Sequence, residues 1–182
     1  MIPPSSSAGG STLTSSIQWD SSWPELIKGD DKNYVLGFFR DRFGILQSVF
    51  ASYHLFRRGP TVWLLSKDER IVNLAFLQVK SVGLPLLRWA KTHLKPTTAA
   101  LQLFGVYADK NIVSLAQDQL QDLVEKKEIK GEFGISPGYV IVVAETIIIG
   151  CALSVPGRLI SQFPRHLFTE QTWEYRPAGT RD

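Results

Sequence analysis

Cysteine is almost absent from this chain of 182 residues, in which Cys151 is the only one. A lone cysteine cannot form an internal disulfide, and such scarcity is typical of proteins from a reducing compartment. Cys151 lies inside an apolar run, with no acid, base or cation beside it in sequence. We therefore expect a small buried hydrophobic residue here and not a reactive thiol.

Motifs for metal or cofactor binding are also lacking. His54, His93 and His166 are isolated from one another, and neither a CxxC nor an HxxxH spacing occurs, which argues against a metal site. The phosphate-binding patterns GxGxxG and GxxxxGK(S/T) are missing as well, and with them any support for a nucleotide cofactor. We expect a protein without catalytic residues, cofactor or metal.

The chain has no apolar run that could cross a membrane. The longest, Ile147–Val155, is far shorter than the roughly 20 residues required, and its β-branched residues favour a strand. The N-terminal residues lack the basic and apolar regions of a secretory signal. Residues 1–20 are rich in serine, glycine and proline, which predicts a disordered tail. We expect a cytoplasmic protein, nuclear or nucleolar if it is eukaryotic.

Neither sign of charge is in large excess, since the formal net charge is +3. The distribution is uneven, however, because residues 57–95 contain eight basic residues against only Asp68 and Glu69. A basic block in a nearly balanced protein favours a face that binds a polyanion. The alternative is that these charges are the solvated edges of an α/β sheet.

What the chain does contain is a series of short periodic segments separated by glycine and proline. The first part of the pattern predicts a helix at 32–43 ended by Gly44, a helical turn at 45–49, a hairpin of strands 51–56 and 61–66, a helix from Ser66 or Asp68 to Phe76, and a strand at 79–89. The next part predicts a helix at 98–104 capped by Thr97 and stopped by Gly105, a strand at 111–115, a helix at 116–127 and a glycine-rich loop at 130–138.

The most informative stretch runs from Ser136 to His166. Three apolar runs, at 139–144, 147–155 and 158–161, are separated by two short polar or Pro-Gly breaks, which predicts consecutive strands of a small β-barrel. The expected fold class is α+β. We divide the chain into the tail (1–20), a mixed α/β domain (21–92), a small β-barrel with flanking helices (93–168) and a C-terminal extension (169–182).

Three segments follow one another in the second half: Gly138-Tyr-Val-Ile-Val, then Ile149-Gly150, then Gly157-Arg-Leu-Ile-Ser-Gln-Phe-Pro-Arg165. This order resembles the PUA-like RNA-binding domain at the C-terminus of Sun (Fmu-type) RNA cytosine-5 methyltransferases. The last segment is similar to that family's Gly-x-apolar-Lys-Asn-x-apolar-Pro-Lys ending, although Ile160 and Ser161 stand where Lys-Asn is usual. The resemblance covers about residues 95–167.

Thr61-Val-Trp-Leu-Leu-Ser-Lys in the first half looks like a hairpin strand of small two-domain ribosome-biogenesis factors. In that family a mixed α/β "pre-PUA" domain precedes a PUA-like domain. The two resemblances imply RNA binding in rRNA or tRNA maturation or modification. Because the Sun-type reaction needs two cysteines and a Rossmann-type cofactor fold, they imply RNA binding without methyl transfer.

Two groups of side chains are candidate RNA contacts. At the end of the expected barrel, Arg158 and Arg165 suit phosphate groups, and Gln162 and His166 suit a base edge or a ribose hydroxyl. The second group is the basic block, with Arg57, Arg58, Arg88, Lys91 and Lys95.

The expected partner is structured RNA, either rRNA or tRNA, together with a ribosome-assembly or RNA-modification protein. Two alternatives stay open. One is an accessory RNA-binding subunit of an RNA methyltransferase, and the other is a protein-interaction scaffold that binds no RNA.

Overall fold

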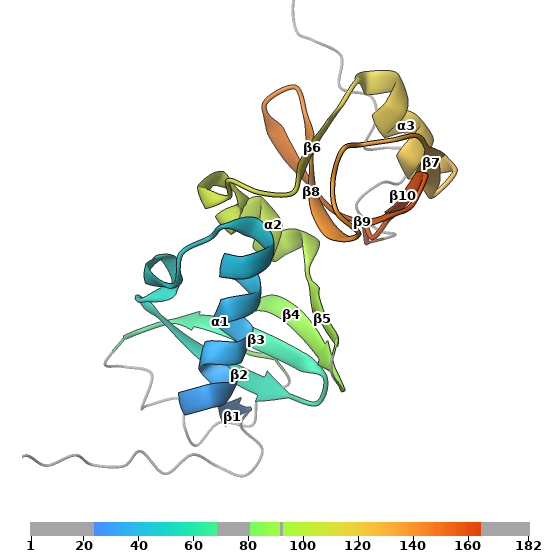
Figure 1. Ribbon diagram of the computed structural model, residues 1–182. Helices are drawn as coiled ribbons and strands as arrows, with labels where there is room; N and C mark the ends of the chain where they lie inside the picture. Colours follow the sequence, from blue (N-terminus) through green and yellow to red (C-terminus); the bar gives the residue numbers. More distant parts are fainter. Residues whose placement is uncertain (1–23, 69–80, 92, 165–182) are drawn as a thin grey trace, which may run out of the picture.

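The computed structural model describes residues 24–68, 81–91 and 93–164, and its α+β fold is built on two five-stranded sheets (Figure 1). The first sheet and its helices comprise β1 (Glu25–Leu26), α1 (Gly29–Phe43), the 3-10 helix η1 (Gln47–Phe50), β2 (Tyr53–Arg58), β3 (Thr61–Ser66), β4 (Leu84–Ala90) and β5 (His93–Pro96). Then follow α2 (Thr98–Phe104), the 3-10 helix η3 (Gly105–Tyr107), β6 (Ile112–Leu115), α3 (Gln117–Glu125), β7 (Glu128–Lys130), β8 (Gly138–Ala144), β9 (Ile147–Val155) and β10 (Arg158–Ser161). The helix expected up to Phe76, the tail at 1–20 and the extension at 169–182 lie outside the described residues.

The first sheet is an antiparallel meander in which each strand pairs with the next one along the chain. The expected hairpin is confirmed. β3 has the expected bounds, whereas β2 reaches two residues closer to the turn than expected, because Arg58 pairs with Thr61 and only Gly59 and Pro60 connect the two strands. The order of the strands is β1-β2-β3-β4-β5, so β1 and β5 form the edges.

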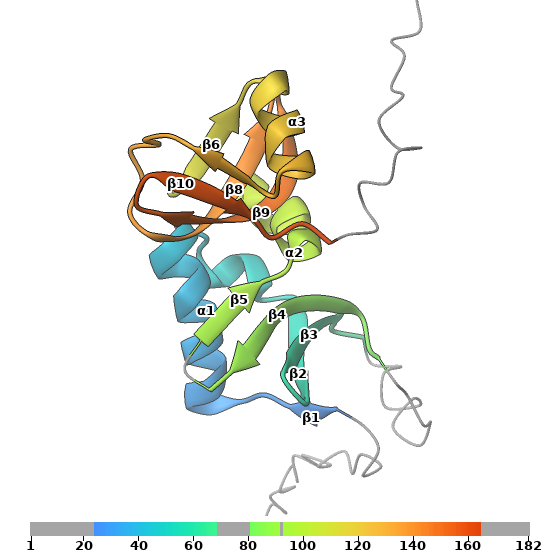
Figure 2. The same cartoon turned by 90° about the vertical axis from the view of Figure 1, so that its right-hand side faces the viewer.

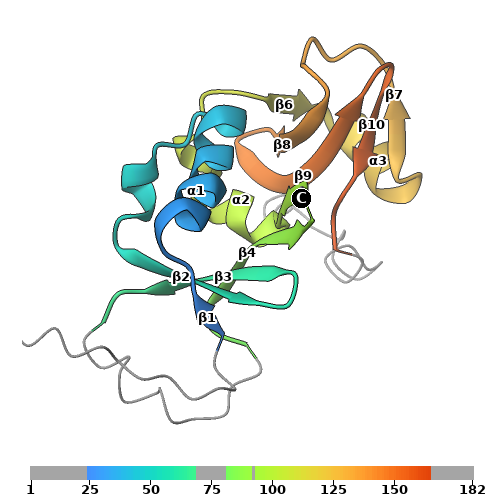
Figure 3. The same ribbon diagram turned by 60° about the horizontal axis from the view of Figure 1, so that its bottom comes forward.

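Helix α1 lies across one face of the first sheet (Figures 1 and 3). Asp30 and Asp31 in its first turn and Arg40 and Arg42 in its last turn complement the helix dipole. Gly44 ends the helix with a left-handed φ of 74°, as the sequence predicts. The helix begins three residues earlier than expected, and the expected helical turn follows it as η1.

The second sheet curls into a half-barrel with strand order β6-β8-β9-β10-β7 (Figures 1 and 2). The three strands expected between residues 136 and 166 are confirmed as β8, β9 and β10, paired antiparallel. β6 lies at the expected position and runs parallel to β8. Helix α3 connects β6 to β7 and packs against β6, β7 and β10. β7 was not expected, because a strand of three residues gives no periodic signal.

Strands β8 and β9 are buried on both faces, which accounts for their unbroken apolar sequences. Ile141 and Cys151 belong to a core shared with the first sheet, α1, η1 and α2. Val140, Val142 and Ala152 point the other way, into a core that includes the apolar face of α3. Cys151 is fully buried, as the sequence predicts.

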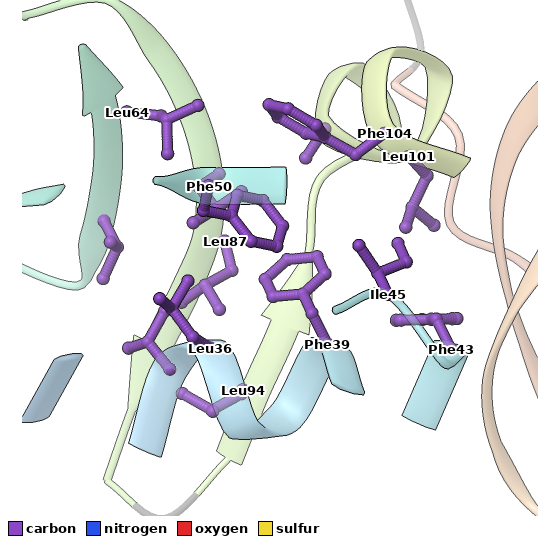
Figure 4. Close-up of a cluster of buried hydrophobic side chains, with 14 of the residues drawn as sticks. Leu36, Phe39, Phe43, Ile45, Phe50, Leu64, Leu87, Leu94, Leu101 and Phe104 are labelled. Atoms are coloured by element: carbon purple, nitrogen blue, oxygen red, sulfur yellow. The ribbon is translucent and has the colours of Figure 1, made fainter. Parts of the chain in front are cut away.

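The core shared by the two sheets is rich in aromatic rings (Figure 4). The ring of Phe50 lies 5.4 Å from that of Phe39 on α1 and 4.8 Å from that of Phe104 on α2, measured between centroids. Such tilted pairs add to the stabilisation from burial. Because α2 contacts both β4 and β9, this shared core joins the two sheets.

The first sheet extends past the boundary expected at residue 92. β5 pairs with β4, with Pro96 opposite Leu87 at one end and His93 opposite Ala90 at the other, and so belongs to the first sheet. This strand was not expected, because its four residues are too few to show alternation. Thr97 then caps α2 as expected, with its Oγ1 accepting a hydrogen bond of 3.0 Å from the N–H of Ala100.

Candidate nucleic-acid interface

Residues from four consecutive strands form a line across the first sheet. Arg58 on β2 pairs with Thr61 on β3. Thr61 also pairs with Arg88 on β4, which pairs in turn with Lys95 on β5. Cross-strand partners project from the same face, with Cβ atoms about 5 Å apart. Since neighbouring strands lie about 4.8 Å apart, the line spans roughly 14 Å. We call these four residues the cationic row.

The cationic row lies on the sheet face opposite α1. Neighbouring side chains in a strand point to opposite faces. Val62, Leu87 and Leu94, each adjacent in sequence to a member of the row, are buried in the core beneath α1. The row therefore points away from that helix, with Arg58 and Arg88 exposed to solvent.

Lys95 connects the row to the second sheet. Its Nζ donates a hydrogen bond to Oε1 of Gln162, the first residue after β10. The backbone N–H of Gln162 donates in turn to the carbonyl of Cys151 on β9, at 3.0 Å. Two candidate residues from different parts of the sequence, Lys95 and Gln162, are thus brought together by the fold.

Arg57 lies on the other face of the sheet, away from the row. Its guanidinium carbon is 4.4 Å from the centre of the Trp89 ring, a cation–π contact. Trp89 also packs on Tyr34 of α1, with ring centroids 5.5 Å apart, and donates from Nε1 to the carbonyl of Lys91 at 3.0 Å. Lys91 is exposed in the turn between β4 and β5. The fold therefore separates Arg57 from Arg58, although they are neighbours in sequence.

Arg158 is separated from the row as well. It begins β10, where its Nη1 donates to Oε2 of Glu128 on β7 at 3.0 Å in a solvent-exposed ion pair. Gln162 follows the other end of β10, about 13 Å away at the usual rise of a strand. Arg165 and His166 lie outside the described residues.

An open groove with a volume of about 800 Å³ runs between α1, β5 and the β8–β9 pair. Its walls include Tyr34, Gly37 and Phe38 of α1, His93 of β5, and the cross-strand partners Tyr139 and Leu153 of β8 and β9. We call it the seam groove, because its walls come from both sheets. The sequence gives no signal for it, because its walls come from segments far apart in the chain.

Arg42 fixes the last turn of α1 to the loop before β8, beside the seam groove. Its Nε donates to the carbonyl of Tyr139 at 2.6 Å, and its two terminal nitrogens donate to the carbonyls of Pro137 and Ser136 at 3.2 and 2.9 Å. Partial burial lowers the pKa of the Arg42 guanidinium and raises the pKa of Tyr139. Gly138 is needed beside it, because a Cβ there would lie 2.9 Å from the Arg42 guanidinium carbon.

One sequence motif bears on the expectation of a protein without catalytic residues. Gly134-Ile-Ser-Pro-Gly138 matches the G-x-S-x-G pattern of serine hydrolases. That pattern acts where the serine sits on a turn from a strand into a helix, within reach of a histidine. Here the segment leads into strand β8, and the Ser136 hydroxyl contacts Arg42 and Asn111. These contacts order the loop and provide no general base.

Two further titratable groups among the described residues have shifted pKa values. Burial raises the pKa of the Cys151 thiol to about 12, which keeps it protonated at neutral pH. Burial and two nearby lysines lower the pKa of His54. Within residues 24–68, 81–91 and 93–164, no three His, Cys, Asp or Glu side chains gather where a metal ion could bind. No helix in those ranges combines the length and apolar character needed to span a bilayer.

No protein-family model matches the chain, and no curated protein is similar enough to be matched. The cationic row and the seam groove are therefore the features on which a functional argument rests.

Proposed function

We propose that this protein binds structured RNA without catalysing a reaction, and that it acts in the maturation or modification of rRNA or tRNA, as in ribosome biogenesis. The cationic row carries the proposal. It arranges Arg58, Arg88 and Lys95 along one line on one sheet face. Arginine side chains bind backbone phosphates in a bidentate manner, and the amide of Gln162 at the end of the row suits a base edge or a 2′-hydroxyl.

The curled second sheet supports a PUA-like assignment of the second half. Its parallel β6–β8 pair, its antiparallel β8, β9 and β10, and α3 between β6 and β7 agree with the small β-barrel with flanking helices that the resemblance implies. The first sheet with α1 would then be the pre-PUA-like half. On this proposal the protein works where these RNAs mature, in the cytoplasm or in a eukaryotic nucleus or nucleolus, beside ribosome-assembly or RNA-modification proteins.

The double variant Arg58→Ala/Arg88→Ala tests the proposal, because it removes two charges from the row and leaves the Lys95–Gln162 hydrogen bond in place. Its affinity for a tRNA and for a structured rRNA fragment is measured by fluorescence anisotropy at salt concentrations from about 50 to 200 mM. We expect weaker binding at every salt concentration. The slope of log K against log salt should become shallower by about one for each phosphate that the variant no longer binds.

The control is Lys126→Ala/Lys130→Ala, which removes two charges from the end of α3 and from β7, in the part of the second sheet that lies away from the first sheet (Figure 1). We expect little change in its RNA affinity. An equal loss of affinity in both double variants would point to net charge alone, and a wild-type protein without salt-dependent RNA binding would overturn the proposal. Arg158→Ala, compared in the same assay, tests the surface that the sequence alone favours.

A further inference from the structure

The seam groove presents aromatic side chains to solvent. Tyr34 is 47% exposed, His93 is exposed, and Phe38 and Tyr139 are half-buried in its walls. Its volume of about 800 Å³ falls within the usual range of ligand sites, about 300–1,000 Å³. An open groove of this size with several rings along it is suited to a flat, unsaturated ligand.

Gly37 keeps the groove open. It is a buried residue in the middle of α1, yet a Cβ placed on it would meet no atom within 4 Å. Glycine in a helix interior is less stable than alanine. Glycine, which is disfavoured inside helices, therefore stands at the position where a side chain would project into the seam groove.

The charged groups around the groove favour an anionic ligand with hydrogen-bonding edges. Arg42 is bound to loop carbonyls but keeps its positive charge, while Arg40 and Asp41 form an exposed ion pair of 2.7 Å. The local charge is therefore positive. The second oxygen of the Asp41 carboxylate can accept a hydrogen bond from a ribose hydroxyl or an exocyclic amino group.

Strand β5 belongs to both the groove and the cationic row. The side chains of Lys95 and His93 project from the face opposite α1, and Leu94 between them faces α1, so the groove and the row meet at the edge that β5 forms. Lys95 ends the row, and His93 lies at the groove. A polynucleotide that follows the row across the first sheet would reach the groove by passing around β5, which is an edge strand.

We propose that the seam groove holds one unpaired nucleotide of the bound RNA, with its base against the aromatic walls and its phosphate on the side of Arg40 and Arg42. This inference rests on the proposed function. Proteins recognise unpaired RNA by stacking splayed bases on aromatic side chains, which every base allows. The row would bind the backbone, and the groove would select RNA that has an unpaired nucleotide next to its duplex.

The test compares an RNA hairpin that carries a short single-stranded 3′ extension with the same hairpin ending flush. Wild-type protein should bind the extended RNA more tightly, by about tenfold or more for one stacked base. Gly37→Leu fills the hollow and should bring the ratio of the two affinities close to one while affinity for the flush hairpin stays unchanged. Gly37→Ala, which adds a single methyl group, is the matched control and should keep most of the preference.

If leucine at position 37 prevents folding, His93→Ala on the exposed edge strand β5 serves as a second variant. This variant should reduce the preference for the extended RNA severalfold. If both variants keep the wild-type ratio, or if wild-type protein binds both RNAs equally, the groove proposal is wrong, while the Arg58→Ala/Arg88→Ala experiment still decides RNA binding. Saturable binding of free AMP without any preference for the extended RNA would also overturn it. A wild-type protein that binds neither RNA would remove the proposed function itself.

Discussion

The two sheets have five strands each but differ in what their faces do. In the first sheet, one face packs against α1, and the other carries the cationic row beside a small cluster around buried Phe56 and Val82. On β3, buried Val62 and Leu64 therefore alternate with residues that are only partly covered. In the second sheet, Val140, Ile141 and Val142 are buried one after another, because β8 has a core on each side. Strands that alternate can offer a face to a partner, whereas strands buried on both sides act as support.

The candidate RNA surface in the structure differs from the one that the sequence favours. The sequence favours the second half, because its apolar runs are long and its end is cationic. In the structure, β8 and β9 form the wall against which α1 and α2 pack, and the line of cations lies on the first sheet. The seam groove exists because the two kinds of sheet meet along β5.

If the second sheet only supports the first, the two sheets should unfold together. Phe39→Ala removes a fully buried ring from the shared core and should lower the free energy of unfolding by about 3–5 kcal/mol. Cys151, on the second sheet, reports whether that sheet opens at the same time. Its thiol, with a pKa of about 12 when buried, should resist a thiol reagent at pH 8 until it is exposed and its pKa returns to the ordinary range.

Urea unfolding followed by far-UV circular dichroism and by Cys151 labelling should therefore give coincident transitions in wild type and in Phe39→Ala, both shifted to lower urea in the variant. Leu159→Ala, in the core beneath α3, serves as the reciprocal variant and should shift both probes too. A labelling midpoint that stays in place in Phe39→Ala would mean that the second sheet folds on its own.

Local signals in the sequence were sufficient for much of the fold. Gly44 and Thr97 end and begin helices through their own backbone and hydroxyl geometry, and β8 and β9 follow from long apolar runs. β5 and β7 were missed because strands this short carry no pattern. The cationic row depends on register across four strands, and the seam groove on three distant segments, so neither could be read from spacing. Arg57 and Arg58 show most clearly what sequence spacing cannot predict, since these adjacent cations point to opposite faces of the sheet.

Arg42 allows a sharper test of how the sheets are joined. Arg42→Ala would remove hydrogen bonds from α1 to the carbonyls of Ser136, Pro137 and Tyr139 and should cost about 2 kcal/mol, because bonds from a charged donor are worth more than neutral ones but this site is partly solvated. Arg40→Ala is the control on the same helix, because its ion pair with Asp41 is exposed and should leave the urea midpoint unchanged. Similar midpoints for the two variants would show that the hydrogen bonds of Arg42 do not hold the sheets together.

The smallest expected effect concerns two helix glycines with opposite surroundings. Gly37→Ala adds a methyl group where no atom lies within 4 Å and should stabilise the protein by about 0.5–1 kcal/mol through helix propensity.

Gly105 also has helical backbone angles, with φ −63°, but a Cβ there would lie 2.9 Å from Cδ1 of Ile148 on β9. Gly105→Ala should therefore lose that gain and be neutral or destabilising, because the added methyl must displace a packed side chain. Thermal unfolding of the two variants decides the sign at each position. A destabilising Gly37→Ala would mean that the seam groove is closed, and an equally stabilising Gly105→Ala would mean that β9 packs too loosely to be the supporting wall.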